Sequence, residues 1–418
     1  MVSLWLRIFL DITNGIIYDK IIMITRKIAL LIIFISLCSL AHSQGVPPKE
    51  EKKNLPPELQ SKVNDAINKG TEYLSRYISM EELPSTSLRD YEGFNHTMRY
   101  ADLILYTLAH CGVATNDDWD KFIQKVTTMK LDKVYHVSLQ AMALEHIDRE
   151  KYQQRIADCA QYLVENQCKN GQWAYGSERD SPRWVKTGKD KEKVVVTDGG
   201  KGSGEQNKPP AKSSSSTQSK NIKPITITGT PQGPATGDNS NTQYAILGLR
   251  ACIESNISIP DATLQSAKKW LLASQNKDGS WGYSSLGIIP SPGYGSMTLG
   301  AVGSLVIVKY HLKELKELNK EAWFTNGMKW LTNKYTVSKN PEGDQQWLYY
   351  YLYAMERLGV LAEQEKIGNN NWYLDGAKFL VAKQSESGEW NGNISDTCFA
   401  LLFLTKATKP LKIVKTGE

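Results

Sequence analysis

Carboxylates are the side chains in this chain best suited to acid–base chemistry, and they gather in few places. The densest cluster is the Asp-Asp-Trp-Asp at residues 117–120. It opens a predicted helix, 117–128, where carboxylates cap free amide groups and complement the helix dipole, so we interpret it as a cap. Glu145 and Glu356 lie near the ends of apolar helices. Paired carboxylates can cleave glycosidic bonds, but a loop follows each glutamate, which favours solvated helix ends.

The elements that must position such groups are helical, because amphipathic stretches with caps and turn signals recur along the chain. We predict twelve helices, near residues 57–79, 94–112, 117–128, 135–147, 149–167, 239–254, 260–275, 295–312, 316–335, 345–358, 371–384 and 395–407. The even-numbered helices are apolar on nearly every face, which is typical of helices buried on most sides. The odd-numbered helices have one charged face. This alternation predicts an inner and an outer layer.

Three of the outer helices end in the same phrase, Gln-x-x-x-Gly-x-Trp. The copies are Gln167, Gly171 and Trp173; Gln275, Gly279 and Trp281; and Gln384, Gly388 and Trp390. The glycine permits the left-handed turn that ends a helix. The glutamine amide can bond backbone groups left open there, and the tryptophan can cover the turn and pack on the next hairpin. Copies lacking Gln and Trp begin at Gly70 and Gly327. Such repetition predicts a repeat architecture.

This phrase resembles the QW motif of the squalene-hopene cyclase and protein prenyltransferase superfamily, and the resemblance covers residues 57–408. The chain looks closest to the secreted bacterial branch, whose members carry phrases like those at 238–245 and 396–402. The resemblance implies an all-α fold. It is an α6/α6 toroid of six helical hairpins, with two concentric helix layers around a central cavity. Twelve predicted helices match six hairpins.

The chemistry of that superfamily has little support here. Its class II cyclases protonate an alkene with Asp-x-Asp-Asp, an order that residues 117–120 lack. The magnesium-binding Asp-Asp-x-x-Asp pattern also fails, because Lys121 stands at the last position. Prenyltransferases hold zinc with a His and with an Asp and Cys one residue apart. Asp396 and Cys398 have this spacing, but we interpret them as a helix cap and a core residue. We expect no metal and no cofactor, and catalysis stays open.

The implied ring places the starts of all inner helices at one end, where helix N-termini favour anionic or hydrogen-bond-accepting ligands. The predicted rim residues are His96, Tyr135, His136, Asp238, Asn241, Tyr294, Gln345, Trp347 and Asp396. The aromatic ones, with the tyrosines of 349–353, could clamp a flat or apolar ligand. The alternative is that Asp and Asn are only caps and that the tyrosines belong to the core.

Residues 177–237 interrupt the ring. They hold eleven Lys or Arg against six Asp or Glu, which accounts for five of the six net positive charges, and they are rich in Ser, Pro and Gly. We predict a flexible basic arm at one rim, with a short hairpin of 194–196 and 225–228 as the alternative. Residues 202–207 look like the thioester motif of complement and macroglobulin toroids, but Ser203 replaces its cysteine. The nearly neutral remainder argues against nucleic-acid binding.

The N-terminus is typical of an export signal. Arg26 and Lys27 precede the apolar run 28–40, and small residues allow cleavage near Ser43, with Met23 as an alternative start. This run of thirteen residues is shorter than the ~20 that span a bilayer, so we expect no stable membrane span after cleavage. The predicted domains are a signal peptide (1–43), a linker (44–56), the toroid (57–408) and a tail (409–418). We predict an exported protein, periplasmic or extracellular.

Composition and cysteine usage complete the sequence-based hypothesis. The chain is 41% apolar and 22% charged, which indicates a globular core. An odd five cysteines remain after cleavage, and we interpret most of them as small core residues. We expect a toroid that binds a hydrophobic or isoprenoid ligand, or an envelope protein partner, at its central cavity or rim. An enzyme with an unrecognised site, either a terpenoid-cyclase-like isomerase or a polysaccharide-processing catalyst, is one alternative. A cell-envelope scaffold is another.

Overall fold

The computed structural model describes residues 55–82, 84–89, 95–113, 116–177, 222–284, 291–315 and 317–411. Its contacts divide the chain into two units, Met1–Pro57 and Glu58–Glu418. The elements below belong to the second unit, apart from the first residue of α2. The predicted signal peptide (1–43) and nearly all of the linker (44–56) lie outside the described residues. Among the residues that are described, no helix is long and apolar enough to cross a membrane.

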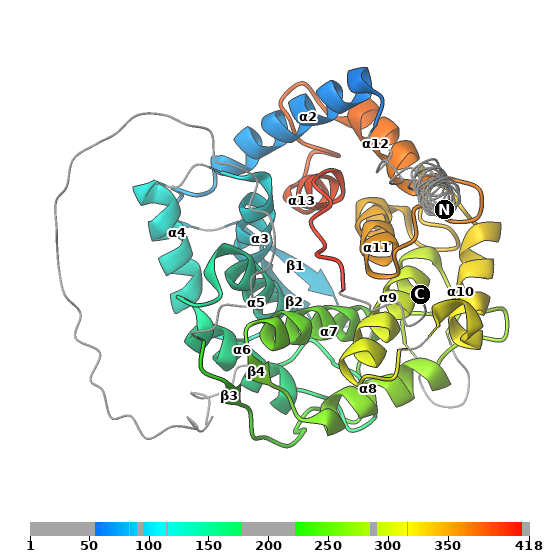
Figure 1. The fold of residues 1–418 in the computed structure, drawn as a ribbon. Coiled ribbons are helices and arrows are strands. Elements are labelled where there is room, and N and C mark those ends of the chain that lie inside the picture. The colour runs from blue at the N-terminus through cyan, green and yellow to red at the C-terminus, as the bar shows by residue number, and fades with distance from the viewer. Residues whose placement is uncertain are drawn as a thin grey trace, which may run out of the picture. The chain divides into compact units, whose positions relative to one another are not determined.

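Twelve α-helices occur in the described part of the second unit, one for each predicted position. Six of them form an inner layer: α3 (Ala101–Cys111), α5 (Val134–Asp148), α7 (Asn239–Glu254), α9 (Gly295–His311), α11 (Leu348–Leu361) and α13 (Ile394–Leu404). Each packs against the next, and α13 packs against α3, so this layer is a closed ring (Figure 1). Residues 295–308 of α9 are all buried, because neighbours cover the helix on every side.

The other six helices surround this ring as an outer layer (Figure 1). They are α2 (Pro57–Ser75), α4 (Asp117–Thr128), α6 (Gln153–Glu165), α8 (Asp261–Ala273), α10 (Ala322–Asn333) and α12 (Trp372–Lys383). Helix α4 is representative, since it buries only four of its twelve residues along one apolar stripe. Asn116 caps it by accepting from the amide of Trp119. The acidic cluster lies in the first turn as predicted, but none of its carboxylates is the capping group. The predicted α6/α6 toroid is therefore confirmed.

The structure differs from the prediction at the start of four helices, among them α6, which begins at Gln153 rather than at 149. The first part of 94–112 is not helical: β1 (Ser85–Arg89) pairs antiparallel with β2 (Asn95–Arg99) before α3 begins. Hydroxyl and amide side chains in this stretch compete for backbone groups, which weakens a helix and suits a hairpin. Short 3₁₀ turns, η1 (Leu318–Lys320) and η2 (Gln345–Trp347), likewise precede α10 and α11.

The three Gln-x-x-x-Gly-x-Trp corners share one geometry. Gln167 Nε2 donates to the carbonyl of Gly171 in its own turn at 3.1 Å and to that of Thr263 in α8 at 2.9 Å. Trp173 is fully buried, and its Nε1 donates to the carbonyl of Leu163 at 2.7 Å. Equivalent bonds occur at the other two corners. The glutamine thus fastens each corner to the next outer helix, beyond its predicted role at the helix end.

The last corner closes the outer layer. Gln384 Nε2 donates to the carbonyl of Ala66 in α2 at 2.9 Å, although the two residues are 318 positions apart in sequence. Trp390 packs on Gly70, where an added Cβ would lie 2.9 Å from the tryptophan ring. The reduced repeat copy in α2 therefore keeps its glycine to receive the tryptophan of the preceding corner.

The prediction of a flexible arm over 177–237 is wrong for its last part. Residues 222–237 pack along the outer wall, and β3 (Ile225–Thr226) pairs in parallel with β4 (Ile257–Ser258). The alternative hairpin partner, 194–196, lies outside the described residues. Ile225 and Ile227 of this segment are buried against the wall. Apolar β-branched residues within a polar stretch thus became strand rather than linker.

The beginning of the predicted tail, 409–418, also packs on the ring. Thr408 donates through its backbone N and its Oγ1 to the Glu356 carboxylate, at 3.0 and 2.6 Å. Lys409 Nζ lies 2.7 Å from the Glu145 carboxylate. The expectation of solvated helix ends is therefore wrong for Glu356, which is fully buried. The chain after α13 folds back over the C-terminal ends of the inner helices and covers this carboxylate.

Candidate functional site

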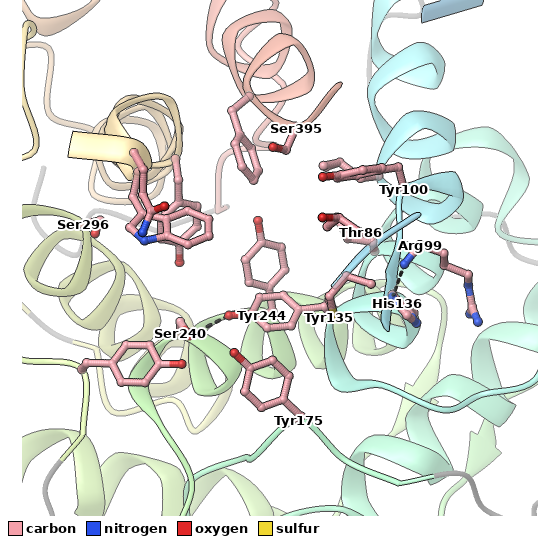
Figure 2. A pocket seen from close by; sticks show the side chains of 18 of the residues that line it. Thr86, Arg99, Tyr100, Tyr135, His136, Tyr175, Ser240, Tyr244, Ser296 and Ser395 are labelled. Carbon is pink, nitrogen blue, oxygen red and sulfur yellow. Dashed lines mark hydrogen bonds between the residues drawn. The ribbon is translucent and has the colours of Figure 1, made fainter. Parts of the chain in front are cut away.

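All six inner helices bring their first turns, or the residues just before them, to one cavity of about 430 Å³. Aromatic side chains dominate its wall: Tyr100, Tyr135, Tyr175, Tyr244, Tyr283, Tyr294, Trp347, Tyr350 and Phe399. Aliphatic and thioether groups fill the spaces between them: Met98, Leu103, Leu139 and Met297. The rings converge on the space between the helices (Figure 2). The starts of the inner helices therefore lie at one end of the ring, as the toroid implied.

The central part of this wall is a continuous chain of rings. Tyr135 and Tyr244 meet edge to face with centroids 4.8 Å apart. Tyr244 stacks on Tyr350 at 6.1 Å, and Tyr350 lies 5.5 Å from Phe399. These rings come from α5, α7, α11 and α13. Such pairs stabilise one another beyond their buried area, so residues far apart in sequence form a fixed apolar surface.

A buried carboxylate stands behind this wall. Asp238 caps α7 and is only 6% exposed. Ser240 Oγ donates to Asp238 Oδ1 at 2.7 Å, and Tyr135 Oη donates to Ser240 Oγ at 2.6 Å (Figure 2). Burial raises the pKa of Asp238, and the hydrogen bonds from Asn241 and Ser240 oppose that change. Burial also raises the pKa of Tyr135 well above its ordinary value, so this phenol keeps its proton at neutral pH.

His136 lies in the wall with both ring nitrogens engaged. Its Nδ1 donates to Asp132 Oδ1 at 2.9 Å, and its Nε2 accepts from the backbone N of Arg99 at 3.2 Å. The Arg99 guanidinium also contacts Asp132 and the buried Asp102. Burial disfavours the Asp132 carboxylate, but the bond from His136 and the charge of Arg99 outweigh it and hold its pKa below the ordinary value. His136 therefore anchors the β2–α5 contact instead of offering a nitrogen to a ligand.

A cation lies beneath the aromatic wall. Arg357 is 3% exposed, and its guanidinium carbon lies 4.3 to 5.6 Å from the ring centroids of Tyr353, Tyr350 and Tyr244. Its Nη2 donates to Gln243 Oε1 at 3.4 Å, and Tyr350 Oη donates to the same oxygen at 2.8 Å. A guanidinium over aromatic faces is attracted by their electron density, so Arg357 holds these tyrosines in place.

The structure separates the predicted rim residues into groups. Tyr135, His136, Tyr294 and Trp347 line the cavity. Asp238 and Asn241 lie behind it and bond each other.

Gln345 and Asp396 bond neighbouring loops. Gln345 Nε2 donates to the carbonyls of Asn340 and Gly343, and Asp396 accepts from two asparagine side chains. His96 lies in β2 rather than at a helix start, which corrects its expected place.

Sequence reasoning missed several wall tyrosines. Tyr175 and Tyr283 each stand two residues after a corner tryptophan, so the repeated phrase extends to Trp-x-Tyr in its first two copies. That extension is a signal that could have found them, because a corner leads the chain from the outer wall to the rim. Tyr100, on the turn after β2, has no comparable signal.

Chemically, the described wall offers hydroxyl groups and apolar surface, together with Arg99, His136 and Gln346. Its lining residues include no Asp or Glu among those the structure describes. Within the described ranges, no group of three His, Cys, Asp or Glu side chains could hold a metal ion. The five cysteines at described positions are free thiols, and four of them are buried.

Comparison with known proteins returns similar structures only. No protein-family model matches the chain, and no curated protein matches it. A type II terpene cyclase, MstE from Scytonema, in complex with geranylgeranyl dihydroxybenzoate, is 9% identical over 84% of this chain and 97% of its own, with a TM-score of 0.45. An ent-copalyl diphosphate synthase from Streptomyces platensis is 14% identical over 72% of this chain and 50% of its own, with a TM-score of 0.36.

A family 76 glycoside hydrolase from a bovine Bacteroides thetaiotaomicron strain is 11% identical over 83% of this chain and 77% of its own, with a TM-score of 0.49. At such identities, and at TM-scores below 0.5, none of these proteins is a basis for this chain's fold or function. The toroid and its cavity rest on the chain's own residues.

Proposed function

We propose that the rim cavity binds an apolar small molecule of the isoprenoid class. The observation that carries this proposal is the wall itself: nine aromatic side chains, four of them from four different inner helices and five from the turns and loops beside them, surround one space of about 430 Å³. That volume falls in the range of roughly 300–1,000 Å³ typical of small-molecule sites. Ring faces and the Leu and Met side chains favour transfer of an apolar ligand from water.

An exported location is part of the same proposal. The basic pair, the apolar run of 28–40 and the small residues before position 44 support it. A protein outside the cytoplasm would meet such a ligand in or near a membrane.

Occlusion of the cavity tests the binding proposal. Leu139 lines the cavity on α5, so Leu139→Trp places an indole in the ligand space. We expect the purified protein to bind farnesol saturably, one molecule per chain, in isothermal titration calorimetry. The Leu139→Trp variant should bind at least about tenfold more weakly, a loss of about 1.4 kcal/mol.

The matched control is Leu272→Trp, because Leu272 is an exposed leucine on outer helix α8. It should bind farnesol as the wild type does, and thermal melting of both variants checks that they are folded. Equal binding by both variants would contradict a site in this cavity. Saturable binding of an oligosaccharide and not of farnesol would favour the polysaccharide alternative. Conversion of farnesol to a product of the same mass would favour the isomerase alternative.

A further inference from the structure

The Tyr135–Ser240–Asp238 chain has a fixed direction. Asp238 Oδ1 accepts from Ser240 Oγ and from the backbone N of Asn241, and Oδ2 accepts from Asn241 Nδ2, at 2.7 to 2.8 Å. Every donor in this cluster points towards the carboxylate, because an ionised carboxylate can only accept. The hydroxyl of Ser240 therefore donates its hydrogen bond to Asp238, and the hydroxyl of Tyr135 donates its own to Ser240.

The consequence lies on the cavity side. A phenol has one O–H and two lone pairs, so the Tyr135 oxygen, whose hydrogen is committed to Ser240, keeps acceptor capacity only. Tyr135 and Ser240 both line the cavity. Bonds that end on a charge polarise one another, which strengthens that acceptor. The hydroxyl hydrogen of Tyr350 is also donated, but its acceptor is the neutral amide oxygen of Gln243.

We propose that Tyr135 is a specificity-determining hydrogen-bond acceptor that selects apolar ligands carrying a donor, an alcohol or phenol, over ligands whose oxygen can only accept. This inference rests on the proposed function and names the substrate class of the same cavity. A ligand hydroxyl would donate to Tyr135 Oη. An ether oxygen at that place would face the lone pairs of the tyrosine oxygen and would have no hydrogen-bond donor. A polar atom buried without a hydrogen bond weakens binding in a site that excludes water.

The test compares farnesol with farnesyl methyl ether on the full chain by calorimetry. We expect the wild type to bind the alcohol about tenfold more tightly than the ether. Tyr135→Phe removes the acceptor and should bring that ratio close to one. In Ser240→Ala the hydrogen of Tyr135 loses its partner and can turn to the ether oxygen. The ether should therefore bind more tightly than in the wild type, and the ratio should fall towards one, because the released O–H can donate to either ligand oxygen.

Two further variants keep the assignment falsifiable. Tyr353→Phe removes a buried hydroxyl that does not line the cavity, and it should leave the ratio unchanged. Tyr350→Phe tests the second committed tyrosine. A loss of preference there and not in Tyr135→Phe would overturn the assignment. Tyr283 also bonds Ser240, so Tyr135→Phe, rather than Ser240→Ala alone, assigns the acceptor.

The outcomes separate the two proposals. If a wild-type protein binds neither ligand, the proposed function fails. If it binds both equally, only the selectivity of Tyr135 fails. If Tyr135→Phe and Ser240→Ala each lose affinity equally for both ligands, the hydrogen bonds from Tyr135 to Ser240 and Asp238 have a purely structural role. That result would also overturn this inference.

Discussion

Glu356 shows at the residue scale how a neighbouring segment changes a side chain's chemistry. Burial raises its pKa to about 7, although hydrogen bonds from Thr408 and the charge of Arg357 act in the opposite direction. The carboxylate is fully enclosed because residues after α13 cover it. The group therefore titrates near neutral pH but does not line the rim cavity, since it lies in the C-terminal half of α11, away from the first turns that form the wall.

Glu356→Gln tests this titration. Because the folded-state pKa of about 7 lies above the ordinary 4.5, the folded protein holds a proton that the unfolded chain releases between these values. The stability contributed by Glu356 is thus complete below pH 4.5 and is lost as the pH rises through 7. The uncharged glutamine avoids that loss. We expect Glu356→Gln to exceed the wild type by roughly 2–3 kcal/mol at pH 8 and to match it at pH 4.5 in urea unfolding.

The control for this prediction is Glu365→Gln, since Glu365 is exposed on the loop before α12. Its unfolding free energy should follow the wild type at every pH. Parallel curves for Glu356→Gln and the wild type would mean that Glu356 is solvated after all.

The corner is the unit that matters at the element scale. Its glycine has a φ of 95° or 96° in all three copies, and its α-carbon lies against the backbone of the next outer helix. At Gly388 an added Cβ would lie 2.4 Å from the carbonyl oxygen of Lys69. The backbone conformation and the close approach both require glycine, so the repeated phrase encodes a helix-to-helix contact as well as a turn.

Gly388→Ala therefore combines a conformational penalty with a backbone clash. Gly392→Ala is the matched control, because its φ is 67° and nothing lies within 4 Å of an added Cβ. We expect Gly392→Ala to lose about 1 kcal/mol of unfolding free energy, and Gly388→Ala to lose roughly 2 kcal/mol more than that. Urea unfolding at constant pH measures both. Equal losses would show that α2 moves aside freely and that the corner does not clamp it.

At the scale of the whole unit, Glu58–Glu418, both helix layers close into a ring. The inner layer closes where α13 meets α3, and the outer layer closes where Gln384 bonds the α2 backbone. These contacts join residues near the two ends of the unit, so the last hairpin is held by the first. The same closure brings Tyr100 and Phe399 to one cavity.

Cleavage of the N-terminal segment can be tested on the whole protein. If the protein is exported as proposed, N-terminal sequencing of the protein from its native host should begin at Gln44, just after Ser43. A chain that retains residues 1–43 would contradict cleavage and favour an uncleaved leader. Fractionation of the same cells measures the location independently of the start.

Much of the fold could be predicted because its signals are local. Helix periodicity and caps placed α4 and α7 to the residue, since capping depends on neighbours within one turn. The repeated phrase predicted the left-handed glycines and the buried tryptophans. The hairpin of β1 and β2 was missed because hydroxyl-rich residues have weak local preferences, and pairing between strands decided their conformation.

The site was predicted only in part. Tyr135 and Trp347 were named for their position at helix starts, and Tyr350 was named with the tyrosines of 349–353, whereas Tyr244 lies beyond the first turn of α7 and was missed. By itself the sequence determined the helices, their two layers and the corners, all of which follow from periodicity and short-range hydrogen bonding. Only the tertiary structure decided which tyrosines share a cavity, that Asp238 orients Tyr135 through Ser240, and that Glu356 is buried, because each depends on contacts between residues far apart in the chain.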